Sequence, residues 1–316
     1  MEKLRSNDIG NVTLVIEGYQ KSAKVMAKRH KVMKTIGLVL TYAALVFLTV
    51  VALFPFYWMI ITSLKSEHEF NATDVTYFPI EGIAFENYVA VFKNFNFLKY
   101  FGNTLVVILI STGITLVLTI FAAFAFSKLK FRGRDTLFFV FLSAMMIPTE
   151  LLVTTNYLTM YKYGLLQGGR FATYLAIMLP FLVNIFYIYL LRQNFMQIPN
   201  ELYLASKVDG KSDWQFLWKV MVPIASPTIV TLLILKVIST WNAYAWPSMV
   251  IRNEDYAIVT VGLKDFADFS VDGDPERQME TLKMAGVSLV TIPLILLFIC
   301  FRKYIMRGVS KAGIKG

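Results

Sequence analysis

The chain has 316 residues, 56% of them hydrophobic and only 16% charged, and its formal net charge is +10 at pH 7. This composition is too apolar for one soluble core and is typical of an integral membrane protein. One cysteine and two histidines exclude a disulfide framework and a cysteine metal cluster, and no histidine or paired-carboxylate constellation indicates catalysis. We therefore expect no catalytic site, no metal and no cofactor in this chain.

Six nearly charge-free runs have the length that a spanning helix needs. A bilayer core about 30 Å thick requires roughly 20 apolar residues in helical form, and these runs do not alternate as the strands of a membrane barrel do. The sequence thus predicts an all-α membrane protein with six transmembrane helices. In chain order the predicted spans are 35–64, 100–127, 136–160, 171–191, 224–246 and 284–301. Pro148 and Glu150 interrupt the third of them.

The distribution of Lys and Arg between the connections predicts the orientation. With the N-terminus inside, the inner segments contain 21 basic and 7 acidic residues, and the outer segments contain 9 basic and 13 acidic residues. The positive-inside rule then places both termini in the cytoplasm, where the basic excess faces anionic lipid rather than nucleic acid. We expect a basic cytoplasmic extension (1–34) without a cleavable signal peptide, a membrane domain (35–301) and a cytoplasmic tail (302–316).

The connection between the fourth and fifth spans, residues 192–223, contains two predicted short helices. Pro199 suits a helix start, and Asp209 and Gly210 end that first helix. Ser212 then offers an N-cap with Gln215 three residues later, which is a capping-box pattern. The apolar positions recur at helical spacing, and they are Leu202, Ala205 and Val208 in the first helix and Trp214, Leu217, Trp218 and Met221 in the second.

Physical chemistry alone leaves two interpretations of this connection open. One is an interfacial helix on the inner leaflet with its tryptophans at headgroup depth, and the other is a docking element for a cytoplasmic partner. A nucleotide site is disfavoured, because residues 205–212 fit the phosphate-loop pattern except that Ala205 replaces its first glycine. No predicted strand precedes the segment, as a phosphate loop requires.

Residues 198–227 resemble the EAA loop of binding-protein-dependent ABC importers. The sequence departs from that motif at Leu204, where a glutamate is expected, at Ser206, where an alanine is expected, and at Lys211, where a small residue is usual. The missing carboxylate at Leu204 puts one polar contact in doubt. The matching residues are Ile198, Pro199, Glu201, Leu202, Ala205, Val208, Asp209, Gly210, Trp214, Pro223 and Pro227.

Further stretches are similar to the six-span permease of maltose-type sugar importers. They are "YGLLQG" (163–168), "WNAYAWP" (241–247) and "RGVSKAGIKG" (307–316), and the resemblance leaves out residues 1–34. It implies a type I ABC importer permease fold in the bacterial inner membrane, with the coupling segment (residues 198–221) moved by ATP binding. The implied contacts with the ATPase are Glu201, Leu202, Ala205, Ser206, Asp209, Gly210, Trp214 and Leu217.

The same resemblance implies the partners. They are a second, different permease that completes the pore, two ATPase subunits that bind ATP and Mg²⁺, and an extracytoplasmic solute-binding protein that delivers a sugar. We expect the acidic outer segment 254–276 to contact the binding protein. The sequence does not name the sugar.

Four residues are candidates for the substrate pathway. Lys236 lies near the middle of the fifth span and Glu150 beside Pro148 in the third, and intramembrane charges are costly and face the bundle or a cavity. Each has an alternative structural role, as a partner of the other or of a backbone carbonyl. Asn242 is treated as a buried amide that must find partners. Trp241, Tyr244 and Trp246 either stack on a sugar or anchor at the interface, and we favour interface and packing for the two tryptophans.

Two other functions compete with this interpretation. A secondary transporter or channel would need no ATPase, but the six spans show no evident inverted repeat and contain only two charges that could couple ions. The second competing function is an ABC permease for a non-sugar solute. The resemblance of "WNAYAWP" (241–247) and of the tail (307–316) to sugar permeases argues against it.

Overall fold

The computed structural model describes residues 2–267 and 280–313, and within these ranges its regular secondary structure is entirely helical. The chain divides into two compact units, residues 1–59 and 60–316. The first unit consists of most of helix α1 (Glu2–Ser63), which includes Pro55. The predicted extension 1–34 is thus continuous with the first span, and the aromatic rings of Phe54 and Trp58 stack at 6.2 Å near its far end.

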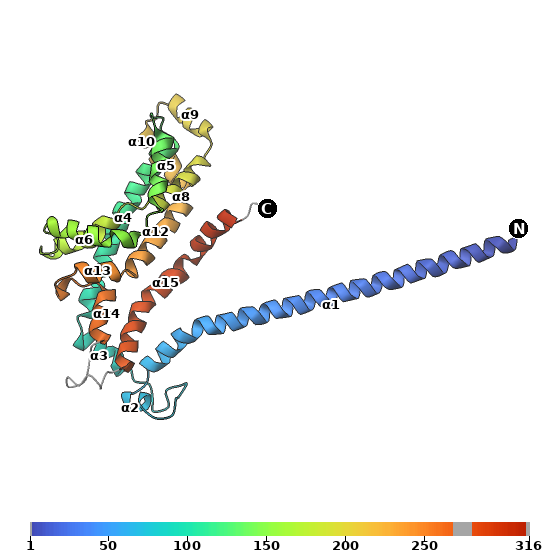
Figure 1. Ribbon diagram of the computed structural model, residues 1–316, viewed down its shortest axis with the longest axis horizontal. Helices are drawn as coiled ribbons and strands as arrows, with labels where there is room; N and C mark the ends of the chain where they lie inside the picture. Colours follow the sequence, from blue (N-terminus) through green and yellow to red (C-terminus); the bar gives the residue numbers. More distant parts are fainter. Residues whose placement is uncertain (1, 268–279, 314–316) are drawn as a thin grey trace. The chain divides into compact units, whose positions relative to one another are not determined.

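The second unit contains all remaining helices (Figure 1). Their bounds are α2 (Glu67–Phe70), α3 (Glu86–Asn94), α4 (Phe97–Ser127), α5 (Arg134–Ala144), η1 (Thr149–Leu152), α6 (Val153–Lys162), α7 (Arg170–Met178), η2 (Leu179–Phe181), α8 (Ile185–Met196), α9 (Asn200–Val208), α10 (Asp213–Phe216), the π-helical η3 (Leu217–Met221), α11 (Val222–Ile224), α12 (Ser226–Trp241), α13 (Ala245–Val250), η4 (Glu254–Tyr256), α14 (Val259–Ala267) and α15 (Glu280–Gly313).

Three helical stretches are long and apolar enough to cross a membrane without a break, namely 28–63, 97–127 and 280–303. Three further pairs of helices reach that length only together, and each pair is bent. The bends are 86° between α5 and the η1–α6 stretch, 56° between the α7–η2 stretch and α8, and 78° between the α10–α11 stretch and α12. These six stretches correspond in order to the six predicted spans.

The breaks have identifiable local causes. Pro148 precedes η1 in an extended conformation, as expected from the interruption predicted there. The fourth span was predicted as continuous, but Pro180 lies in η2 and the Asn184 side chain caps α8 by accepting from the Tyr187 N–H at 3.1 Å. Because proline lacks the N–H that continues a helix, the first helical stretch ends at η2. The next helix, α8, begins with its own N-cap.

The core of the second unit is built around α4, which packs along α8, α12 and α14. One end of α4 contributes Ile120, Ala123 and Phe124 to a buried cluster with α8 and the coupling segment. Near its other end, the buried Asn103 side chain donates to the carbonyls of Asp255 and Ala257 at 3.1 and 2.8 Å. Figure 1 shows α9 beyond the first of these ends, and α3 and α14 near the second.

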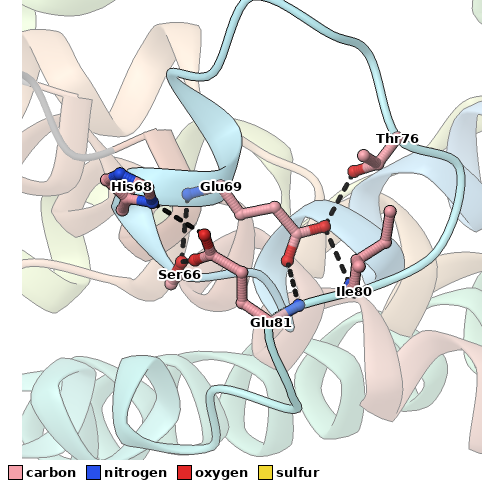
Figure 2. A network of polar contacts seen from close by, with 6 residues as sticks. All are labelled: Ser66, His68, Glu69, Thr76, Ile80 and Glu81. Carbon is pink, nitrogen blue, oxygen red and sulfur yellow. Dashed lines mark hydrogen bonds and ion pairs between the residues drawn. The ribbon is translucent and has the colours of Figure 1, made fainter.

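The predicted outer connection after the first span folds around a buried carboxylate, Glu69, which is 5% exposed. Figure 2 shows Glu69 accepting from the Thr76 hydroxyl at 2.7 Å, the Ile80 N–H at 3.0 Å and the Glu81 N–H at 3.3 Å. Burial alone raises the pKa of Glu69, but these hydrogen bonds and the nearby Lys65 ammonium bring that pKa below its ordinary value. The connection is therefore organised by an ionised side chain.

The acidic outer segment is partly described. It contains η4 and α14, in agreement with the predicted loop and short helical piece, and residues 268–279 lie outside the described part. At the C-terminus, α15 continues past the predicted span end at 301 as far as Gly313. The first part of the predicted tail is thus helical.

Candidate functional site

The coupling segment consists of two short helices joined by a tight turn, as predicted. The turn is a Schellman motif, in which the Lys211 N–H donates to the Ser206 carbonyl at 2.9 Å and the Gly210 N–H to the Lys207 carbonyl at 3.1 Å. Gly210 has φ +73°, which is the left-handed conformation that glycine adopts without steric cost. The turn thus provides hydrogen-bond donors for the last carbonyls of α9 and reverses the direction of the chain.

The second helix begins with the predicted capping box. The Ser212 hydroxyl accepts from the Gln215 N–H at 3.3 Å, and the Gln215 side chain accepts from the Ser212 N–H at 3.1 Å. The α-helix covers only 213–216 and continues as the π-helical η3, where a single uninterrupted helix was expected. In η3 the Val222 N–H donates to the Leu217 carbonyl five residues back, one residue before Pro223 removes the next donor.

An acidic side chain, Asp213, joins the two helices. Its Oδ1 accepts from the Tyr203 hydroxyl at 2.7 Å and pairs with the Lys207 ammonium at 2.7 Å. The Tyr203 ring also packs edge-on against Phe216 at 5.1 Å. Contacts from α9 to α10 on both sides of the turn make the segment one structural piece.

The base of the coupling segment is buried against α4 and α8. Phe216, Leu217 and Met221 are fully buried and pack with Phe195 and Leu191 of α8 and with α4 residues. Trp214 and Trp218 pack on Phe121 of α4, with ring separations of 5.6 and 6.2 Å. The stripe that was predicted to be amphipathic is therefore largely an anchor to the membrane helices.

Several apolar side chains of α9 and α10 are exposed. Leu202, Leu204 and Val208 of α9 are 44%, 62% and 88% exposed, and the charged side chains of Glu201 and Lys207 are exposed among them. Trp214 of α10 keeps 60% of its surface exposed despite its contact with Phe121. Exposed apolar side chains on an anchored pair of helices have the character of a docking surface.

The structure divides the eight predicted ATPase contacts into two groups. Leu217 and Ser206 contact the chain's own interior: Leu217 is in the buried cluster, and the Ser206 hydroxyl donates to the Tyr203 carbonyl at 2.7 Å. The six exposed members are Glu201, Leu202, Ala205, Asp209, Gly210 and Trp214.

The four predicted pathway residues are not brought together as one polar cluster. Lys236 is 7% exposed and donates to the Phe181 carbonyl at 3.0 Å, which is the backbone alternative stated for it. Glu150 is exposed and accepts from the Thr149 hydroxyl at 3.3 Å, and the described residues contain no Lys236–Glu150 ion pair. Asn242 is exposed, so the expectation of a buried amide was wrong, because α12 ends there and turns the side chain outward.

The two tryptophans beside these residues are packing elements. The indole N–H of Trp241 donates to the Val290 carbonyl at 3.2 Å, and that of Trp246 donates to the Ala176 carbonyl at 3.1 Å. Both side chains are buried, so the packing alternative is confirmed for them. Tyr244 lies between them in sequence and remains half exposed.

Two cationic side chains at the base of the coupling segment were not identified from the sequence. Lys128, just after α4, donates to the Ile198 carbonyl at 2.7 Å and to the Asn200 side-chain oxygen at 2.9 Å. Arg192 of α8 donates to the Phe126 carbonyl at 3.1 Å. A basic residue after an apolar run signals only the membrane boundary, and acceptors about 70 residues away leave no trace in the local pattern.

The fold defines the class: an apolar helical protein with up to six candidate membrane spans, in which the anchored and partly exposed coupling segment follows the fourth of them. A family model described as the binding-protein-dependent transport system inner membrane component matches residues 115–311. The chain belongs to this family of ABC transporter permeases.

Several relatives are permease proteins of sugar or oligosaccharide transport systems. The arabinooligosaccharide transport system permease AraQ of Halalkalibacterium halodurans is 26% identical over 272 residues, covering 85% of this chain and 94% of the relative. The lactose transport system permease LacG of Rhizobium radiobacter is 28% identical over 271 residues, again covering 85% and 94%.

Solved structures agree with the family. A chain of a bacterial ABC transporter involved in import of the acidic polysaccharide alginate matches with a TM-score of 0.76 and 27% identity over 85% of this chain and 96% of that one. A chain of an alginate ABC transporter in complex with an alginate pentasaccharide-bound periplasmic protein matches with a TM-score of 0.58 at 16% identity, over 86% and 97%. The second match supports the fold alone.

Proposed function

We propose that this chain is the membrane permease subunit of an ATP-driven, binding-protein-dependent importer of sugars or oligosaccharides. It forms half of the translocation pore, crosses the bacterial inner membrane six times with both termini in the cytoplasm, and pairs with a second, different permease. The observation that carries the proposal is the coupling segment, because Asp213 joins its two helices, its base is buried and it exposes several apolar side chains. These are the properties of a lever that a partner moves.

The energy source resides in the partners. Two ATPase subunits bind ATP and Mg²⁺ and dock on the exposed face of α9, and an extracytoplasmic binding protein delivers the solute at the opposite side. Glu201, Leu202, Ala205, Asp209 and Trp214 are the proposed contacts. Leu204 replaces a carboxylate expected there with an exposed apolar side chain, so we expect an apolar contact at this position.

Reconstitution of the complete transporter tests this function. Vesicles that contain both permeases and the ATPase, with binding protein outside, should accumulate labelled oligosaccharide only when ATP is inside. Because the relatives' names cover neutral and acidic saccharides, the panel should include both kinds. Accumulation without ATP, or driven by an ion gradient, would refute the proposal.

Lys236, Asn242, Tyr244 and Glu150 are proposed to line the solute pathway. Lys236→Met removes the ammonium but keeps the length of the side chain, so we expect the apparent KM for uptake to rise by several-fold while the ATPase rate is retained. Ser239→Ala on the same helix is exposed and serves as the matched control. Unchanged affinity and selectivity in Lys236→Met would remove this residue from the pathway.

A further inference from the structure

The start of α9 is bound by a buried cation from another element. Lys128 is only 7% exposed, and its ammonium reaches the Ile198 carbonyl and the Asn200 side chain on either side of Pro199. Pro199 provides no side-chain cap to α9. The ammonium therefore fixes two oxygens at the point where the coupling segment begins.

This placement is electrostatically costly. Burying an ammonium is unfavourable unless its hydrogen bonds are satisfied, and the N-terminus of a helix carries a partial positive charge that repels it. Burial lowers the pKa of Lys128, and the Glu201 carboxylate in the first turn of α9 acts in the opposite direction. An apolar side chain would avoid this cost but would leave the two oxygens without this hydrogen-bond donor.

The hydrogen bonds of Lys128 provide directionality that the neighbouring apolar packing lacks. Phe216, Leu217 and Met221 hold the base of the segment against α4 and α8, but apolar contacts are non-directional and permit sliding. Hydrogen bonds to two oxygens fix the register of α9 relative to the end of α4. Arg192 fixes α8 to the same end of α4 through the Phe126 carbonyl.

We propose that Lys128 is a positioning residue that ties the start of the coupling segment to α4, so that a displacement of α9 by the ATPase is passed directly to α4. This inference rests on the proposed transport function. It assigns α4, in addition to α8 and α12, which continue the coupling segment in sequence, to the moving part of the permease. The Lys128 contact is then a transmission element rather than a docking contact.

The test compares transported solute with hydrolysed ATP in the reconstituted transporter. Lys128→Met keeps the stem but loses the ammonium, and we expect the ratio of transport to hydrolysis to fall at least 10-fold while the complex assembles and hydrolyses ATP. Lys128→Arg retains a donor to both oxygens and should restore most of the ratio. Asn200→Ala removes one acceptor and should give an intermediate loss.

Lys130→Met, two residues further and exposed, is the matched control and should resemble the wild type. A wild-type ratio in an assembled Lys128→Met transporter overturns the inference. A loss of assembly in Lys128→Met that Arg does not reverse also overturns it, because the residue is then needed only for folding. The wild type is measured alongside, and if it shows no ATP-driven uptake, the proposed function fails independently of Lys128.

Discussion

Gly210 determines the geometry of the turn between α9 and α10. Its φ of +73° is open to glycine, and a Cβ placed there would meet nothing within 4 Å, so the effect of Gly210→Ala comes from the backbone alone. We expect a local cost of about 1–2 kcal/mol and a reduced ratio of transport to ATP hydrolysis in vesicles. Gly210→Pro should be more severe, because proline cannot take this φ and removes the N–H bonded to Lys207.

Gly210→Asn is the control for this prediction. Asparagine tolerates the left-handed conformation better than alanine does, so its ratio of transport to hydrolysis should lie closer to the wild type. If the alanine and proline variants both transported normally, the turn would not be part of the lever.

Glu69 predicts acid sensitivity of the outer connection. Because its pKa in the folded chain lies below the ordinary value of about 4.3, its contribution to stability is present above that ordinary value and is lost as the pH falls through the folded pKa. A spin label at Val75→Cys, in a Cys300→Ala background, should become mobile only on acidification below about pH 4.3. Glu69→Gln should make the label mobile already at pH 7.

Glu86 provides the comparison for Glu69, since it is an exposed carboxylate near the same connection. Glu86→Gln should leave both the mobility at pH 7 and the acid response unchanged. An acid response that persists in Glu69→Gln would assign the sensitivity to another group, such as the His68–Glu81 pair.

The residues that could be predicted from the sequence are those whose partners are close along the chain. Gly210 and the Ser212–Gln215 box follow from signals within three or four residues, and the structure contains both. The acceptors of Lys128 and Lys236 lie 70 and 55 residues away, and they depend on how α4, α8 and α12 pack. The sequence therefore identified Lys236 as an unusual residue, but it could not decide whether its partner is Glu150 or a backbone carbonyl. It did not identify Lys128.

At the scale of the element, α9 belongs to a segment whose base is buried, and it exposes apolar side chains to the surface. Leu204→Ser and Val208→Ser should barely change folding, because both side chains are exposed and such substitutions usually lie within about 0.5 kcal/mol. Burial of each side chain at an ATPase interface contributes about 1.5–3 kcal/mol, so we expect roughly 10- to 100-fold weaker ATPase binding. Equilibrium binding of the purified ATPase to permease in nanodiscs measures this.

Lys219→Ser is the matched surface control for α9, since Lys219 is exposed on η3. Its ATPase affinity should equal that of the wild type. Equal affinity in the Leu204 and Val208 variants would instead show that the ATPase binds elsewhere.

Helix breaks could be predicted only where the sequence signal was isolated. Pro148 beside Glu150 was such a signal, and α5 and η1 separate there. Pro180 lies within an apolar run, so hydropathy alone predicts one continuous span there. Asn184 is a good N-cap and is the local signal that a new helix begins. The π-helical η3 ends next to Pro223, but a proline at that place predicts the loss of a donor and not the five-residue hydrogen bond that precedes it.

For the whole molecule, the proposed orientation predicts which surface each connection reaches. In a Cys300→Ala background, Gln167→Cys should react with a membrane-impermeant thiol reagent in intact cells, because residues 161–170 are placed outside. Lys130→Cys should react only in inverted vesicles. Reaction of Lys130→Cys in intact cells would invert the topology.

The match over residues 115–311 covers the part of the chain where the motifs were recognised, and it explains why the architecture was easier to anticipate than the site. Six apolar runs and the basic excess between them constrain a membrane fold strongly. In the proposed transporter, the positions of Lys236, Asn242 and Tyr244 relative to a solute depend on the second permease. Their proposed roles therefore concern the assembled transporter and not one sequence.

The exposed side chains on α9 also affect the life of the protein before assembly. In the proposed importer, a newly made copy without its ATPase would present Leu202, Leu204, Val208 and Trp214 to the cytoplasm, and exposed apolar side chains of this kind are an aggregation liability. The residues proposed to bind the ATPase would then be the part of an unassembled subunit that aggregates, and we expect the permease to accumulate only when its ATPase is made in balance with it.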